Sequence, residues 1–273
     1  MSAAVLEAQT TPGAEGLSAI RARPREALIG FDFDGTLSPI VDDPADARAH
    51  PGVAPALRRL APLVGTVAVI TGRPAATAVE LGGFADIEGL LVLGQYGRER
   101  WENGELQTPE PPPGVAEARA KLSQILANPP EGVAVEDKGL ALAVHTRRAA
   151  EPQVALERLR SIIEALAERT GLVVEPGRYV LELRPPGMDK GAALRALAAE
   201  RGASAVLFAG DDLGDLAAYD AIDALRKEGT PGVKVCSSSD EVTALAERAD
   251  LTVDGPPGVV GLIEGLASEL PSR

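Results

Sequence analysis

The chain has 273 residues, and its 45% hydrophobic and 25% charged residues are typical of a globular protein with ample material for a core. Its 27 basic and 40 acidic side chains give a net charge of −13, which repels a phosphate backbone and argues against a nucleic-acid binder. No apolar run approaches the ~18 residues of a membrane-spanning helix. A single cysteine and the lack of a secretory signal pattern lead us to expect a cytoplasmic protein.

Short apolar segments alternate with helical patterns along most of the chain. Residues 1–23 come first, and we interpret them as a flexible leader that becomes helical near its end. The later apolar segments are continuous rather than alternating, as in strands that are buried on both faces of a parallel sheet. Their alternation with helices predicts an open α/β sheet with 27–31 and 205–209 as central strands. The other expected strands are 66–70, 89–93, 232–235 and 251–253, and the expected helices are 53–63, 75–81, 191–201, 213–225 and 241–248.

Two proline-rich stretches, 110–114 and 184–187, interrupt this alternation. Proline fixes φ and removes a backbone donor, so both stretches favour stiff connections. Between them the order helix, strand, strand occurs twice, which predicts a small α+β domain with two helices covering one antiparallel sheet. Its expected helices are 115–126 and 151–169, and its expected strands are 133–137, 141–145, 172–175 and 180–183. We therefore expect a leader at 1–23, a core domain at 24–109 and 187–273, and an inserted α+β domain at 110–186.

Acidic side chains follow the two expected central strands. In open α/β sheets a ligand binds beyond the carboxyl ends of the strands, so these positions are the ones to examine. Asp32 and Asp34 leave an extended backbone on the same side. Joined by Asp211, they form a cluster of hard oxygen ligands of the kind that holds Mg²⁺. An acidic surface turn is the alternative interpretation of the Asp32–Thr36 segment taken alone.

The same strand and helix ends offer every group that hydrolysis of a phosphate monoester needs. Enzymes accelerate this reaction by up to ~10²¹-fold, whereas one well-placed donor supplies only roughly 3–4 kcal/mol. Asp32 can attack phosphorus, and Asp34 can protonate the leaving alcohol and then deprotonate water. Thr71 and Lys190 can bind phosphoryl oxygens, while Asp211 joins the two earlier aspartates in holding Mg²⁺. We expect further substrate contacts from Gly35, Gly72 and Arg73.

Four segments resemble the motifs of the haloacid dehalogenase superfamily in their usual order. They are Asp32–Thr36, Thr71, Lys190 and Gly210–Asp215. The resemblance implies a Rossmann-like core, dependence on Mg²⁺ and an aspartyl-phosphate intermediate. The insertion falls between the second and third motifs, as in the subgroup whose α+β cap domain lies over the site and selects the substrate.

Further segments are similar to the trehalose-6-phosphate phosphatases, over roughly residues 27–266. They are 34–40 with Pro44, 69–73, 135–138, 145–147 and 181–185. The resemblance implies hydrolysis of trehalose 6-phosphate to trehalose and phosphate, in trehalose biosynthesis. It also implies sugar contacts from four cap residues, Glu136, Lys138, Arg147 and Glu182.

The chain departs from that family pattern at two places. Gln95-Tyr96 stands where the family often has x-His, and Gly214-Asp215-Leu216 stands where it often has Thr-Asp-Glu. The first departure concerns one substrate contact, and the second removes a carboxylate near the metal. Neither departure touches the expected nucleophile or acid.

Several alternatives stay open on the residues alone. Glu136 and Lys138 share a strand face and could instead belong to a surface ion pair worth ~0.2–1 kcal/mol. The same chemistry could serve another sugar phosphate, or a phosphotransferase that passes the phosphoryl group to a second sugar. A non-catalytic sugar-phosphate sensor is disfavoured because both Asp32 and Asp34 are present. We expect a small sugar phosphate as the partner, and neither nucleic acid nor membrane.

Overall fold

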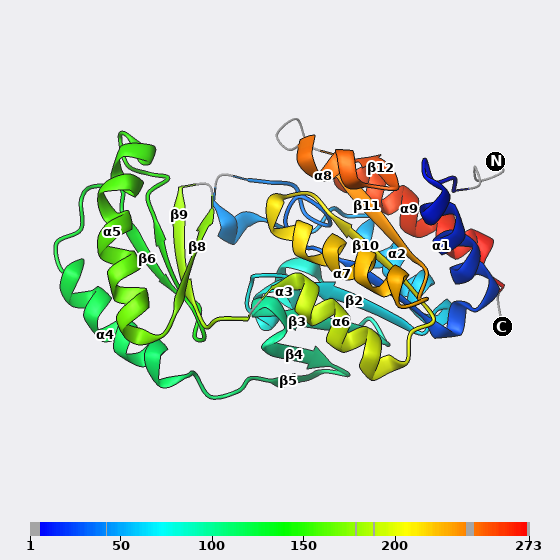
Figure 1. Cartoon of the computed structure of the whole chain (residues 1–273), viewed down its shortest axis with the longest axis horizontal. Helices are drawn as coiled ribbons and strands as arrows, with labels where there is room; N and C mark the ends of the chain where they lie inside the picture. Colours follow the sequence, from blue (N-terminus) through cyan, green and yellow to red (C-terminus); the bar gives the residue numbers. More distant parts are fainter. Residues whose placement is uncertain (1–5, 42, 178, 188, 239–242, 272–273) are drawn as a thin grey trace. The chain divides into compact units, whose positions relative to one another are not determined.

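Two compact units make up the chain (Figure 1). The computed structural model describes residues 6–41, 43–177, 179–187, 189–238 and 243–271. Unit 1 comprises Met1–Thr108 and Asp189–Arg273, and unit 2 comprises Pro109–Met188. The prolines at 111–113 and at 185–186 lie just inside the bounds of unit 2. Among the described residues, no helix is both long enough and apolar enough to cross a membrane.

Unit 1 is built on an eight-stranded sheet with the order β12-β11-β10-β1-β2-β3-β4-β5. The first six strands in this order run parallel, and β4 and β5 form an antiparallel hairpin at one edge. Every residue of the two central strands is buried, which explains their continuous apolar sequences. The strands are β1 (Ala27–Phe31), β2 (Thr66–Ile70), β3 (Leu90–Gly94), β4 (Glu99–Glu102), β5 (Glu105–Gln107), β10 (Ala205–Gly210), β11 (Gly232–Ser238) and β12 (Leu251–Asp254).

Successive side chains of β1 enter two separate hydrophobic cores. Ile29 and Phe31 pack with α1 (Thr11–Ala22), α2 (Val53–Leu60), α3 (Ala75–Gly82) and α9 (Gly255–Glu269). Leu28 packs on the other face with α6 (Lys190–Arg201), α7 (Leu216–Lys227) and α8 (Thr243–Arg248). Helices therefore cover both faces of the sheet, and the predicted open α/β core is confirmed. The first two residues of the expected helix 241–248 lie outside the described residues.

The N-terminal segment differs from the flexible leader that we expected. Its helix α1 already begins at Thr11, and the Thr10 hydroxyl accepts a hydrogen bond from the Gly13 amide at 3.1 Å. Leu17 and Ile20 are fully buried, and a Cβ on Gly16 would come within 2.3 Å of a backbone oxygen of β11. The packing face consists partly of glycines, so its hydrophobic pattern in the sequence is weak. Close approach of the backbone holds this helix on the sheet.

The C-terminal helix α9 was missed in the sequence. Its first turn contains Pro256 and Pro257, which suggest a loop although proline is tolerated in the first turn of a helix. Val259, Leu262 and Leu266 of this helix are buried in the same core as α1. Figure 1 shows α1 and α9 side by side, and a salt bridge of 2.8 Å joins Arg21 of α1 to Glu269 of α9. Helices α1 and α9 thus contribute to the same face of unit 1.

Unit 2 consists of a four-stranded antiparallel sheet, with two helices packed on one of its faces. The strand order is β6-β7-β9-β8, and the pattern of helix, strand, strand occurs twice as predicted. Leu142, Val144, Leu181 and Leu183 of the sheet share a hydrophobic core with both helices. The elements are α4 (Pro113–Ile125), β6 (Ala134–Asp137), β7 (Leu142–His145), α5 (Pro152–Thr170), β8 (Val173–Gly177) and β9 (Val180–Arg184).

Replacing Leu17 with alanine tests whether α1 is part of the core of unit 1. Because Leu17 is 1% exposed, we expect the free energy of unfolding to fall by about 2–5 kcal/mol in denaturant titrations. Ser18→Ala on the exposed side of the same helix is the control and should change this free energy by less than about 0.5 kcal/mol. Equal, small effects of both substitutions would mean that α1 is not packed in solution.

Candidate active site

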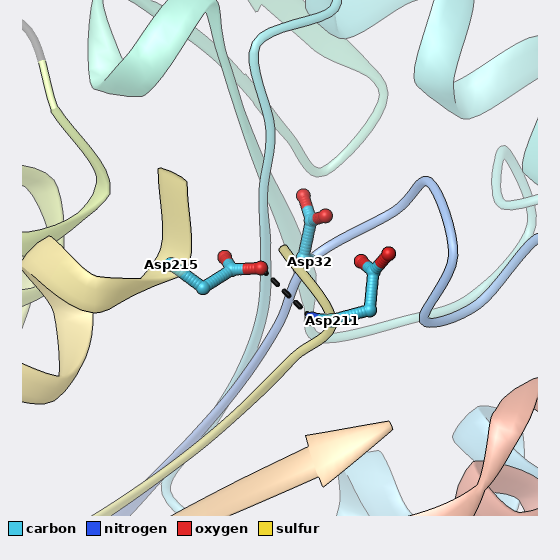
Figure 2. Close-up of side chains that lie close together, drawn as sticks. All are labelled: Asp32, Asp211 and Asp215. Atoms are coloured by element: carbon cyan, nitrogen blue, oxygen red, sulfur yellow. Dashed lines mark hydrogen bonds between the residues drawn. The ribbon is translucent and has the colours of Figure 1, made fainter. Parts of the chain in front are cut away.

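Three buried carboxylates meet at the carboxyl edge of the unit 1 sheet (Figure 2). Asp32 follows β1, Asp211 follows β10, and Asp215 ends the short 3₁₀ helix η5 (Leu213–Asp215). One carboxylate oxygen from each residue lies within 4.8 Å of the corresponding oxygens of the other two. Strands β1 and β10 are parallel neighbours, so the residues that follow them emerge at the same edge of the sheet.

Lys190 supplies the positive charge in this cluster. It is the first residue of α6, and its side chain is only 6% exposed. Its Nζ lies 2.8 Å from Asp32 Oδ1 and 2.8 Å from Asp215 Oδ1. A buried ammonium group is tolerated because two carboxylates compensate it. The third motif residue is therefore connected directly to the expected nucleophile.

Asp215 organises the loop that carries Asp211. Its Oδ2 accepts hydrogen bonds from the backbone amides of Asp211 at 2.9 Å and of Asp212 at 3.1 Å. The Asp212 side chain in turn accepts a hydrogen bond from the Gly214 amide at 2.9 Å, and Asp212 and Asp215 form a capping box. We did not expect Asp215 in the group of carboxylates that could hold a metal ion. The signal in the sequence is an acidic residue three positions after an Asp N-cap.

The turn after β1 is fitted closely around Asp211. Gly35 has a left-handed φ of 72°, and a Cβ at this position would lie 1.8 Å from Asp211 Oδ2. Only glycine fits here, because any side chain would displace the carboxylate. The Thr36 hydroxyl donates to Asp211 Oδ1 at 3.2 Å, and the Ser237 hydroxyl donates to the Gly35 carbonyl at 2.9 Å.

The carboxylate of Asp34 lies with Arg73, outside the cluster of three carboxylates. Arg73 Nε donates to Asp34 Oδ2 and Nη2 donates to Oδ1, both at 2.7 Å. We expected Asp34 among the metal ligands, whereas the close group contains Asp32, Asp211 and Asp215. The expectation assumed extended backbone through residue 34. The strand ends at Phe31, and the chain turns between Asp34 and Ser38, so strand alternation no longer applies.

Thr71 and Gly72 belong to a turn that a strained neighbouring loop holds in place. Gln95 and Tyr96 both have left-handed φ, 47° and 58°, which costs non-glycine residues about 1–3 kcal/mol each. The Tyr96 amide donates to the Thr71 carbonyl at 2.9 Å, and the Gln95 amide donates to the Arg73 carbonyl at 2.8 Å. A Cβ on Gly72 would lie 2.7 Å from the Tyr96 hydroxyl oxygen. The unusual Gln95-Tyr96 pair thus packs directly on the turn that carries Thr71.

The expected sugar contacts lie on unit 2. Strand register puts Glu136, Ala143 and Glu182 in one row across β6, β7 and β9, on the face opposite the helices. Lys138 Nζ lies 2.6 Å from Glu182 Oε2, and Glu136 Oε2 lies 2.8 Å from His145 Nε2. Arg147 is partly buried in the turn after β7. Both carboxylates therefore have basic partners.

Glu182 has one further property that bears on ligand binding. The residue is 7% exposed, and its Oε1 is buried without a hydrogen-bond donor among the described residues. A buried carboxylate oxygen without a donor is costly, and a hydroxyl group could satisfy it.

Burial and mutual repulsion shift the pKa values of the groups in the acidic cluster. Burial raises the pKa of Asp211 to about 8, and the charges of Asp215 and Asp212 add to the rise. Burial likewise raises the pKa of Asp32 and of Asp215, against the opposing effect of Lys190. Burial alone would lower the pKa of Lys190, but Asp215 and Asp32 raise it above its usual range. When all three carboxylates are ionised, the cluster and its one ammonium group carry an excess of two negative charges.

The residues present fit a hard divalent cation. Carboxylate oxygens are the ligands that such cations prefer, and the excess of negative charge matches the charge of the ion. A bound cation would stabilise the ionised form of the cluster, so metal binding and proton release are coupled.

A bound divalent cation should therefore stabilise the protein more at high pH than at low pH. Without the cation, folded Asp211 keeps its proton up to a pH of about 8, whereas an unfolded aspartate loses it near a pH of about 3.9. Stability from this group is thus lost as the pH rises toward 8. We expect Mg²⁺ to raise the melting temperature more at about pH 8.5 than at about pH 6. A larger shift at the lower pH, measured against NaCl of equal ionic strength, would contradict the coupling.

A family model described as trehalose-phosphatase matches residues 30–256. A trehalose-phosphate phosphatase of Mycobacterium avium is 34% identical to 95% of this chain, and one of Mycobacterium marinum is 35% identical to 90% of it. The chain spans 66% and 63% of the length of these two relatives.

Solved structures agree with the family match. Aspergillus fumigatus trehalose-6-phosphate phosphatase is 26% identical with a TM-score of 0.66, over 97% of this chain and 98% of the other. The C-terminal domain of Candida albicans trehalose-6-phosphate phosphatase shares the fold at 20% identity and a TM-score of 0.76, over 97% of this chain and 100% of the other. The resemblance drawn from the motifs is confirmed: this chain belongs to the trehalose-phosphatase family.

Proposed function

We propose that this chain hydrolyses trehalose 6-phosphate to trehalose and phosphate, with Mg²⁺ as its cofactor. The observation that carries the proposal is the buried group of Asp32, Asp211 and Asp215 around Lys190, at the carboxyl edge of the parallel sheet. Membership of the trehalose-phosphatase family supports this substrate. Asp32, Asp211 and Asp215 would hold the ion, which when bound neutralises charge on the cluster and on the phosphate.

Asp32 and Asp34 divide the covalent chemistry in this proposal. The Asp32 carboxylate attacks phosphorus, the bond from phosphorus to the sugar oxygen breaks, and Asp34 gives that oxygen a proton. Asp34, now a carboxylate, takes a proton from water as the water oxygen attacks phosphorus. The bond between phosphorus and Asp32 then breaks and releases phosphate. After both steps Asp32 is again a free carboxylate, and Asp34 again carries the proton that the next cycle needs.

Thr71 and Lys190 stabilise the charge that develops on the phosphoryl oxygens in this proposal. Thr71 is 1% exposed, and its turn is fixed by Tyr96 and Gln95, so its hydroxyl needs little reordering. Lys190 already lies between Asp32 and Asp215. Donors held in place before the reaction contribute more than donors that must move.

Unit 2 supplies sugar recognition in this proposal. Glu136, Lys138, Arg147 and Glu182 offer acceptors and donors that suit hydroxyl groups. The buried Oε1 of Glu182, which has no donor among the described residues, is the group that most directly supports a hydroxyl-bearing ligand. Phosphate release across a panel of sugar phosphates measures the preference, and no preference for trehalose 6-phosphate would move the proposal to another sugar phosphate.

Asp32→Asn should abolish turnover while leaving the fold intact. The amide cannot act as the nucleophile, so we expect phosphate release to fall by at least about 10³-fold, as for other lost nucleophiles. Asp189→Asn is the matched control: Asp189 accepts a hydrogen bond from the Ala192 amide at 2.7 Å, as the N-cap of α6 beside Lys190. It should keep most of the activity. Full activity of Asp32→Asn would remove the proposed mechanism.

Glu182→Ala should separate sugar recognition from phosphate chemistry. We expect kcat/KM for trehalose 6-phosphate to fall by about 10- to 100-fold, because a buried acceptor for a hydroxyl is lost. Turnover of p-nitrophenyl phosphate, which has no sugar, should stay within about threefold of native.

Glu175→Ala is the matched control for Glu182→Ala. Glu175 lies directly opposite Glu182 in the same row of the sheet, and its carboxylate pairs with Arg184 at 2.6 Å. Its side chain is 47% exposed, and we assign it no substrate contact. Equal losses on both esters in Glu182→Ala would argue against sugar recognition by this face.

A further inference from the structure

All three nitrogens of the Arg73 guanidinium donate hydrogen bonds. Nε and Nη2 each donate to one oxygen of Asp34 at 2.7 Å, and Nη1 donates to the Pro44 carbonyl at 2.8 Å. Its guanidinium carbon lies 5.6 Å from the ring centroid of Phe33, which is fully buried. A guanidinium fixed in this fork geometry is a rigid partner for one carboxylate.

The backbone of Arg73 is fixed as well. Its amide donates to the Thr71 hydroxyl at 3.1 Å, and its carbonyl accepts from the Gln95 amide at 2.8 Å. The strained loop at Gln95 and Tyr96 thus secures the residue from which the guanidinium extends. A surface ion pair does not need hydrogen bonds that fix both the backbone and the side chain of its arginine.

The Asp34 side chain, in contrast, is restrained little by its own surroundings and needs a contact that fixes its rotamer. Asp34 sits in the turn after β1, and its side chain is 43% exposed while that of Arg73 is 14% exposed. A carboxylate this exposed would sample several rotamers if it were alone, which is unfavourable for a group that must exchange a proton at a fixed point. The two-point contact with Arg73 removes that freedom before substrate arrives.

We propose that Arg73 is a positioning residue that holds the Asp34 carboxylate in place for proton exchange with the sugar oxygen, rather than a contact to the substrate. The inference rests on the proposed function and reassigns Arg73 from the substrate contacts expected in the sequence. Its guanidinium neither gives nor takes a proton. It acts only through the orientation of Asp34, so its removal should affect those reactions that depend on Asp34.

The leaving group provides the test of this dependence. A sugar alkoxide is a poor leaving group and needs the proton from Asp34, whereas p-nitrophenolate leaves as a stable anion. We expect Arg73→Ala to lower kcat on the best sugar phosphate on the order of 10- to 100-fold, with KM within about threefold of native. On p-nitrophenyl phosphate, the loss should stay below about threefold.

A double-mutant cycle identifies the residue through which Arg73 acts. Asp34→Asn should show the same dependence on the leaving group, and Arg73→Ala should cost nothing further in the Asp34→Asn background. Arg73→Lys keeps the charge but cannot form both hydrogen bonds, so it should behave like Arg73→Ala. Arg58→Ala is the control, because it removes another arginine–carboxylate pair of 2.7 Å, with Asp86, that has no part in the proposed chemistry.

Several results would overturn the inference while leaving the proposed function intact. They are an equal loss on both esters, a loss confined to KM, a full additive loss in the double variant, or full activity of Arg73→Lys. Native protein that releases no phosphate from either ester would instead remove the proposed function, and this inference with it.

Discussion

The contact between the Lys190 ammonium and two buried carboxylates, Asp32 and Asp215, is the interaction on which the rest of the site depends. It allows three carboxylates to share a space in which one oxygen of each lies within 4.8 Å of the others. It does not balance them fully, because one positive charge faces three acidic groups. Burial, and after it the charges of neighbouring carboxylates, raises the pKa values of these carboxyls. A buried site with more acidic than basic groups favours the binding of a cation.

The fold assembles this cluster from distant parts of the chain by the geometry of parallel strands. Asp32 and Asp211 are far apart in sequence but follow adjacent strands, and Lys190 begins the helix that returns the chain from unit 2 to the same sheet. Glycine at position 35 then permits the first turn to close on Asp211. Supporting contacts surround the reactive groups: Asp215 fixes the Asp211 loop, and the strained Gln95-Tyr96 turn fixes the Thr71 turn. Rigid support of this kind is what reactive side chains need in order to act without reordering.

Much of this could be predicted from the sequence, and the failures have physical causes. Continuous apolar segments identified the central strands because both sheet faces are covered. The residues after these strands predicted that Asp32 and Asp211 lie close together, as the structure shows. The side-chain direction of Asp34 could not be predicted, because strand alternation ends where the chain turns. The contacts of Arg73 with Asp34 and Pro44 join three segments that are separate in the sequence, so they could not be predicted from it. The helices at both ends were missed or shortened because glycine and proline, which weaken a helical pattern, here serve close packing and the first turn.

The central claim is that Asp32, held by Lys190 beside the acidic cluster, becomes covalently bonded to phosphorus. Rapid acid quenching of the native protein during turnover of its sugar phosphate, followed by peptide mass mapping, measures this directly. The account predicts that the peptide containing Asp32 gains one phosphoryl group, and that the modification disappears when substrate is exhausted. Phosphorylation of a different residue, or phosphate release at an unchanged rate without any phosphorylated peptide, would contradict it.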